Sequence, residues 1–250
     1  MAYQSVFQRY ELKYLLTKAQ KETILQAMEP YMDLDKYGRT VIRNIYYDTD
    51  DHLLIRRSIE RPIYKEKLRL RSYQRAEHDM PVFVELKKKF DSVVYKRRVS
   101  MHQDEAMSWL EGKAPSPVDS QISREIDYVR SFYGSLKPRV FLSYEREAYY
   151  TKDGSDFRVT FDDTILCRQD ALTLDSQVYG TPILPEDRVL MEIKCSGGIP
   201  LWMTQLLTRE RIFKTSYSKY GTAYKTLIFP QRFLTNTHEC EVTTYDRSAF

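Results

Sequence analysis

Acidic and basic side chains recur at every second residue in several segments of this 250-residue sequence. The segment RYELKYLL places Glu11 and Lys13 on the same side of an extended chain, because residues two apart in a strand point the same way. The same Glu-x-Lys spacing occurs twice more, at Glu85/Lys87 and Glu192/Lys194. Lysine and arginine bind phosphate oxygens well, and carboxylates either hold such cations in place or ligate a hard divalent metal ion. The spacing therefore indicates polyanion chemistry.

Further charged residues alternate with apolar ones in neighbouring segments. One side of each such strand is apolar and the other side carries the charge. The charged or polar members are Lys65, Lys67, Arg69 and Arg71 in KEKLRLRSY, Tyr144 and Arg146 in SYERE, and Arg158 and Asp162 in FRVTFDD. Several strands thus present cations on one face each.

The elements that must position these residues can be predicted from hydrophobic periodicity and turn residues. Strand patterns cover 6–16, 40–48, 63–73, 81–90, 92–101, 139–151, 157–167 and 188–195. Helical patterns cover 17–31, 50–60, 104–112, 123–137, 199–213 and 218–229. Thr17 is a candidate N-cap for the first helix, and the segment 90–92 predicts a tight hairpin.

About eight antiparallel strands commonly close into a barrel wide enough for a small ligand. We therefore expect an α+β fold, an eight-stranded antiparallel β-barrel with helices packed outside. The apolar stripes of those helices need apolar partners, so the apolar strand faces must point outward and the charged faces inward. For any one strand, a solvated face with cross-strand ion pairs is the alternative. A mainly cationic lumen would need a polyanion to relieve its self-repulsion.

Composition limits the partners and the compartment. The net charge is +4, from 39 basic and 35 acidic residues, which is weaker than expected for a protein that coats a nucleic acid, so we expect no nucleic-acid partner. The three cysteines show no CxxC spacing, which favours a reduced, cytoplasmic protein. The chain starts without an apolar signal region, and no window approaches about 18 apolar residues, so we expect neither secretion by that route nor a membrane span.

Nine short segments, most of them charged, are informative as an ordered set along the chain. They are RYELKY, IYYDT, KLRLRSY, VFVELKKK, VYKRR, SYERE, FRVTFD, MEIK and SYSKYGTAY, from about Phe7 to Ile228. This set resembles the VTC domain, the polyphosphate polymerase domain of the vacuolar transporter chaperone complex, within the triphosphate tunnel metalloenzyme or CYTH-like superfamily. The resemblance implies a tunnel of eight antiparallel strands with helices outside. We expect one such domain over residues 1–230 and a polar C-terminal tail at 231–250.

The resemblance also implies roles for individual residues. The basic positions that grip a nucleotide triphosphate tail or polyphosphate, which we assign to catalysis, are Lys13, Arg69, Arg71, Lys87, Arg146, Lys194 and Lys219. Glu192 matches the acidic residue that binds Mn²⁺ or Mg²⁺, and Glu11 and Glu85 are candidate metal ligands or supports for neighbouring cations. Further substrate contacts are assigned to Arg9, Arg57, Arg98, Arg158 and Tyr144.

One departure from the family pattern bears on activity. Hydrolytic relatives carry Glu-x-Glu-x-Lys in the first strand, whereas this sequence has Arg9 at the first position. That change favours a polymerase that moves the γ-phosphate of ATP or another nucleoside triphosphate onto polyphosphate, although Glu11 keeps one carboxylate that the eukaryotic polymerase pattern tends to lack. Two alternatives stay open: a tripolyphosphate or nucleoside triphosphate hydrolase of the same fold, and a non-catalytic polyphosphate sensor. Because the eukaryotic family joins this domain to membrane helices, a separate membrane partner at the inner face of the membrane is a further expectation.

Overall fold

The computed structural model describes residues 10–77, 80–91 and 93–230. Within them, eleven strands form one antiparallel sheet in the order β11-β1-β10-β8-β7-β3-β4-β5-β6, and β2 and β9 pair with β7 and β8. The strands are β1 (Tyr10–Thr17), β2 (Met32–Leu34), β3 (Thr40–Asp48), β4 (Tyr64–Ser72), β5 (Val82–Phe90), β6 (Val93–Met101), β7 (Lys137–Thr151), β8 (Phe157–Arg168), β9 (Thr181–Pro182), β10 (Arg188–Cys195) and β11 (Lys214–Thr215). The helices are α1 (Lys18–Met28), α2 (Leu53–Ile59), α3 (Gln103–Leu110), α4 (Gln121–Tyr133), α5 (Leu201–Arg209), α6 (Lys219–Ala223) and the π-helical turn η1 (Tyr224–Ile228).

The prediction of a closed eight-stranded barrel is wrong. The eight predicted strands are present, but β2, β9 and β11 extend the sheet, and no pairing joins β6 to β1 in the described part of the chain. The edge of β1 that would have to meet β6 pairs instead with β11, where Lys13 lies opposite Thr215. Strands of two or three residues are too short to show alternation, so the sequence pattern did not reveal them. The α+β class and the antiparallel arrangement are confirmed.

Local signals in the sequence set the first helix and the central hairpin. The Thr17 side chain accepts a hydrogen bond from the Gln20 backbone nitrogen at 3.1 Å, and the Gln20 side chain accepts one from the Thr17 backbone at 3.0 Å. This reciprocal pair is a capping box that satisfies amides at the start of α1. Strands β5 and β6 pair up to Phe90 and Val93, with Asp91 at a φ of 40° in the turn.

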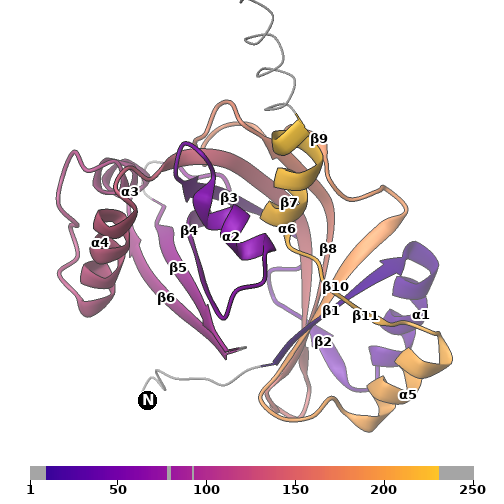
Figure 1. Ribbon diagram of the computed structural model, residues 1–250. Coiled ribbons are helices and arrows are strands. Elements are labelled where there is room, and N and C mark those ends of the chain that lie inside the picture. Colours follow the sequence, from indigo (N-terminus) through magenta and orange to yellow (C-terminus); the bar gives the residue numbers. More distant parts are fainter. Residues whose placement is uncertain (1–9, 78–79, 92, 231–250) are drawn as a thin grey trace, which may run out of the picture.

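Two hydrophobic cores lie on the outer face of the bent sheet (Figure 1). One core joins β4, β5 and β6 to α3 and α4, with Trp109 and Leu68 fully buried. The other core joins β1, β8 and β10 to α1 and α5, with Leu16 and Met191 fully buried. The apolar strand faces therefore point outward to helices, as the sequence pattern predicted, and the charged strand faces share the inner side.

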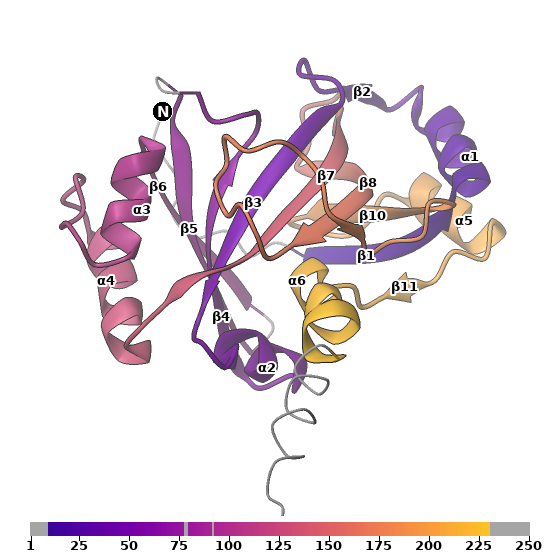
Figure 2. The same ribbon diagram turned by 90° about the horizontal axis from the view of Figure 1, so that it is seen from above.

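The bent sheet has two wings, one formed by β4, β5 and β6 and the other by β1, β10 and β8. A third core lies on the inner side, between these two wings. Tyr46 of β3 and Tyr144 of β7 pack there with residues of α2 and α6, and the Tyr46 and Tyr220 rings stack at 4.8 Å. Figure 2 shows α6 and α2 beside the strands at this point. The packing brings the first residue of α6, Lys219, to the charged inner face.

In the part of the chain that the structure describes, no helix is both long enough and apolar enough to cross a membrane.

Candidate functional site

Glu192 on β10 is the centre of a cluster of four cations. Its carboxylate lies 3.2 Å from Lys13, 3.4 Å from Lys219 and 3.5 Å from both Lys194 and Arg146. The register explains the meeting, since β1 and β8 flank β10 and place Lys13 opposite Glu192. Burial opposes ionisation of this carboxyl, but Lys219, Lys13, Lys194 and Arg146 outweigh it and hold the pKa of Glu192 well below its usual value.

Asp162 on β8 belongs to the same cluster, although we did not assign it to the site from the sequence. Its side chain is fully buried, and Arg146 donates to its two oxygens at 2.5 and 2.6 Å. Lys219 also donates to Asp162, at 2.5 Å. Such a two-pronged arginine contact fixes the guanidinium strongly. The signal was present in FRVTFDD, where Asp162 shares a strand face with Arg158.

A second cluster surrounds Glu85 on β5. Its carboxylate is 2.7 Å from Arg69 and from Lys96, 3.8 Å from Arg71, and in contact with Arg98. Only 1% of the Glu85 side chain is exposed. Burial opposes its charge, but Arg69, Arg71, Lys96 and Arg98 outweigh burial and lower the pKa of Glu85 far below its usual value. Glu85 therefore holds these four cations in place.

The two clusters meet across the inner face. Lys87 on β5 donates to Glu11 on β1 at 2.9 Å, and Glu11 also lies 3.5 Å from Lys13. Arg71 donates to the Tyr144 hydroxyl at 3.1 Å, and the Tyr144 ring lies 4.4 Å from the Lys219 ammonium. Side chains thus connect the strands of both wings even though the sheet is open.

Lys67 on β4 lies where the clusters meet, and cations dominate its surroundings. Its ammonium donates to the Ser218 hydroxyl at 2.9 Å, at the start of α6. Burial, followed by repulsion from Lys87, Lys13, Lys65 and Arg69, lowers the pKa of Lys67 to about 7. For Lys194, burial and Arg146 outweigh the attraction of Glu192 and lower the pKa to about 8. Depressed lysine pKa values at a convergence of cations are the electrostatic signature of a face suited to a polyanion.

The structure brings together most of the residues assigned from the sequence. Arg158 lies opposite Lys194 in the pairing of β8 with β10 and stacks on Tyr150 at 4.5 Å. Its buried Nε has no hydrogen-bond partner within the described chain. Arg57 is not brought to the inner face, because it lies on α2 and interacts with Tyr133 of α4. Arg9 lies outside the described residues.

Glu11 and Glu192 are the carboxylates that could share a metal ion. Both contact the ammonium of Lys13, and both offer the hard oxygen donors that Mn²⁺ and Mg²⁺ require. Across residues 10–77, 80–91 and 93–230, no three Asp, Glu, His or Cys side chains group as a metal centre. Magnesium is commonly held by one or two carboxylates together with substrate phosphates. The donor set therefore fits a metal ion that binds with its phosphate ligand.

We expect the unliganded protein to become more stable between pH 6.5 and 8.5. In this range the unfolded chain keeps Lys67 and Lys194 protonated, whereas the folded chain releases their protons because their pKa values fall to about 7 and about 8. The unfolded state then binds more protons, so stability rises with pH. Thermal melts across this range test it, and Lys67→Met should flatten the slope. A melting temperature that falls with pH in the wild type would contradict the crowding of cations.

Two solved structures share the fold. One is a "putative adenylate cyclase" from Bacillus halodurans, with 15% identity and a TM-score of 0.53 over 86% of this chain and 94% of that one. The other is a "putative adenylate cyclase" from Vibrio parahaemolyticus, with 13% identity and a TM-score of 0.50 over 88% of this chain and 98% of that one. At these identities the likeness establishes the fold alone. No curated protein sequence matches this chain.

An antiparallel sheet with a cationic inner face defines the class of protein. The family model of the VTC domain matches residues 8–228. The chain belongs to the VTC domain family, which confirms the resemblance seen in the charged segments. Membership of this family supports a function in binding a triphosphate or polyphosphate.

Proposed function

We propose that this protein is a metal-dependent polyphosphate polymerase that transfers the γ-phosphate of a nucleoside triphosphate to a growing polyphosphate chain on the inner face. The observation that carries the proposal is the convergence of cations from both wings around Lys67, whose own partner is the neutral Ser218. Cations outnumber carboxylates there, and a polyphosphate would supply the missing negative charge.

The arginines and lysines have different tasks. Arg146 and Arg69 are fixed by Asp162 and Glu85, so their guanidinium groups are held in position before substrate arrives. Lys13 and Lys87 approach from opposite wings and act as point charges. Phosphoryl transfer needs mainly such positioning and neutralisation of charge on the transferred group. A divalent metal ion held by Glu192 and Glu11 would neutralise further charge on the phosphates.

The acidity of the carboxylates favours a phosphate acceptor over water. A general base works best when its pKa lies near the operating pH. Burial and Glu192 oppose ionisation of Glu11, but with Lys87 and Lys13 beside it the pKa of Glu11 still falls well below its usual value. The pKa of Glu192 is also lowered. Neither carboxylate is a good base for activating water, whereas the terminal oxygen of polyphosphate is already anionic and needs none.

Incubation with ATP and Mn²⁺, with separate assays for long-chain polyphosphate and free phosphate, tests the proposal. We expect polyphosphate to accumulate together with nucleoside diphosphate, and little free phosphate. Millimolar tripolyphosphate should also raise the melting temperature, because a ligand that binds only the folded state stabilises it. Free phosphate as the sole product would make the protein a hydrolase. Stabilisation without any turnover would make it a sensor, and an unchanged melting curve would remove the polyanion site altogether.

A further inference from the structure

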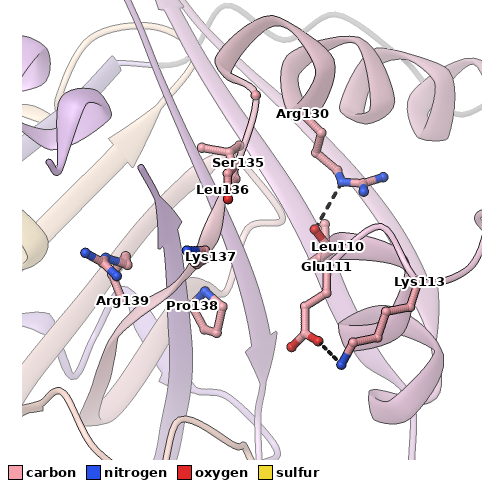
Figure 3. A pocket seen from close by; sticks show the side chains of 10 residues that line it. Leu110, Glu111, Lys113, Arg130, Ser135, Leu136, Lys137, Pro138 and Arg139 are labelled. Atoms are coloured by element: carbon pink, nitrogen blue, oxygen red, sulfur yellow. Dashed lines mark hydrogen bonds and ion pairs between the residues drawn. The ribbon is translucent and has the colours of Figure 1, made fainter. Parts of the chain in front are cut away.

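A cavity of about 420 Å³ lies outside the inner face, between the ends of α3 and α4 and the start of β7 (Figure 3). Its lining includes Leu110 and Glu111 at the end of α3, Arg130 on α4, and Lys137 and Arg139 on β7. Lys113 also lines it and pairs with Glu111. The volume lies within the range of pockets that hold small molecules, and basic side chains dominate the charged lining.

The basic side chains are held in place by groups around the cavity. Arg130 donates through Nε to the Leu110 carbonyl at 3.1 Å and through Nη1 to Asp127 at 2.8 Å. A guanidinium carries five N–H donors, so Arg130 has donors beyond these two bonds. Across the cavity, Arg139 donates to the Asp50 carbonyl at 2.7 Å, and Lys137 lies 3.2 Å from the Asp50 carboxylate. The guanidinium of Arg130 is therefore oriented and still has donor capacity.

A buried hydroxyl beside the cavity has no partner. Tyr47 is 1% exposed, and its hydroxyl makes no hydrogen bond in the described chain. Burial, with Glu111 adding to it and Arg130 opposing it, raises the pKa of this hydroxyl, so it stays a protonated donor near these two lining residues. An unpaired buried hydroxyl costs free energy, but Tyr47 itself is not among the residues that line the cavity.

We propose that this cavity is a second anion-binding site, which takes a phosphorylated small molecule with its phosphate beside Arg130 and Lys137. Arginine and lysine side chains bind phosphate oxygens well, and the lining carries two of each: Arg130, Arg139, Lys113 and Lys137. The site is separate from the polyphosphate site: Tyr47 points to the outer side of β3, whereas the neighbouring Tyr46 accepts a hydrogen bond from Arg69 on the inner side.

Trp109 provides a reporter for this site alone. Its indole Nε1 donates to Asp127 at 2.7 Å, and the same Asp127 oxygen accepts from Arg130. The other tryptophan, Trp202, lies on α5 and stacks on Tyr31. Helix α5 lies at the opposite end of the molecule from α3 and α4 (Figure 1). In Trp202→Phe, all tryptophan fluorescence therefore comes from beside the cavity.

The experiment titrates Trp202→Phe with inorganic phosphate at constant ionic strength, with sodium chloride as the salt control. We expect a saturable change in Trp109 fluorescence with phosphate alone. Lys137→Glu, at a half-exposed side chain that should not affect folding, should weaken it at least about tenfold, and Arg130→Gln should do the same. Arg124→Gln is the matched control, since Arg124 lies on the same helix but pairs with exposed Asp119 and does not line the cavity.

Lys13→Ala in the same background should leave the Trp109 response unchanged, which separates this site from the polyphosphate site. The proposal is overturned if phosphate gives no response up to tens of millimolar, if chloride gives the same response, or if Lys137→Glu leaves the affinity unaltered. A response lost in Lys13→Ala but kept in Lys137→Glu would assign the binding to the inner face instead.

Discussion

Glu192→Gln is expected to lower polyphosphate synthesis about 100-fold or more while tripolyphosphate still binds. Glutamine keeps the shape of the side chain but removes the charge that four cations surround, and with it the carboxylate that would hold a metal ion beside the substrate. The basic residues remain and are less neutralised, so the rise in melting temperature on adding tripolyphosphate should exceed that of the wild type. Synthesis is measured with ATP and Mn²⁺, and binding by thermal melts.

Loss of the carboxylate should also destabilise the unliganded protein. Removing one partner of a buried ion pair typically costs about 3–5 kcal/mol, because the other charges stay buried and uncompensated. Glu147→Gln is the control. Glu147 contacts Lys21 and Arg39 on the outer side of the sheet, so its loss should leave synthesis unchanged. Wild-type synthesis by Glu192→Gln, or an equal loss in Glu147→Gln, would remove Glu192 from the mechanism.

The sequence predicted the strands and the direction of their faces because both depend on local alternation. Leu68 and Leu70 point to the outer core, while Arg69 and Arg71 point inward, as period-2 patterning requires. Closure of the sheet is a different matter, since it depends on which strand covers each edge. Strand β11 pairs with β1 and occupies the edge that a barrel would use. Because β11 has only two residues, its sequence shows no alternation from which a strand could be predicted.

The site was predicted in part for a similar reason. Lys13 and Glu192 were assigned from the family resemblance, and their contact follows from strand register, which a single sequence does not specify. Asp162 was passed over because one aspartate on a strand carries little information until Arg146 and Lys219 are seen to converge on it. Arg57, in contrast, was assigned to the substrate but does not lie on the inner face. Its helix packs on the sheet in an orientation that turns the side chain toward α4.

The neighbours Lys67 and Leu68 offer the sharpest test of which strand face carries function. Lys67→Met removes one cation from a crowded set, so it should raise the melting temperature of the empty protein at pH 6.5, where that lysine is mostly charged. It should also weaken tripolyphosphate binding about tenfold or more, because a hydrogen bond to a charged group contributes about 1.5–3 kcal/mol. Titration calorimetry measures the affinity.

Leu68→Ala should have the opposite profile. Leu68 is 1% exposed and packs in the outer core with α3 and α4, so its truncation should cost about 2–5 kcal/mol of unfolding free energy. Tripolyphosphate affinity of the folded protein should not change, because the side chain points away from the inner face. Denaturant unfolding and calorimetry on both variants give the comparison. If Leu68→Ala weakened binding while Lys67→Met lowered stability and bound normally, the charged face of β4 would not be the one that meets polyphosphate. Lys67 and Leu68 are neighbours on the same strand and differ in the face to which their side chains point. The difference between the two variants therefore reports which face of β4 carries function.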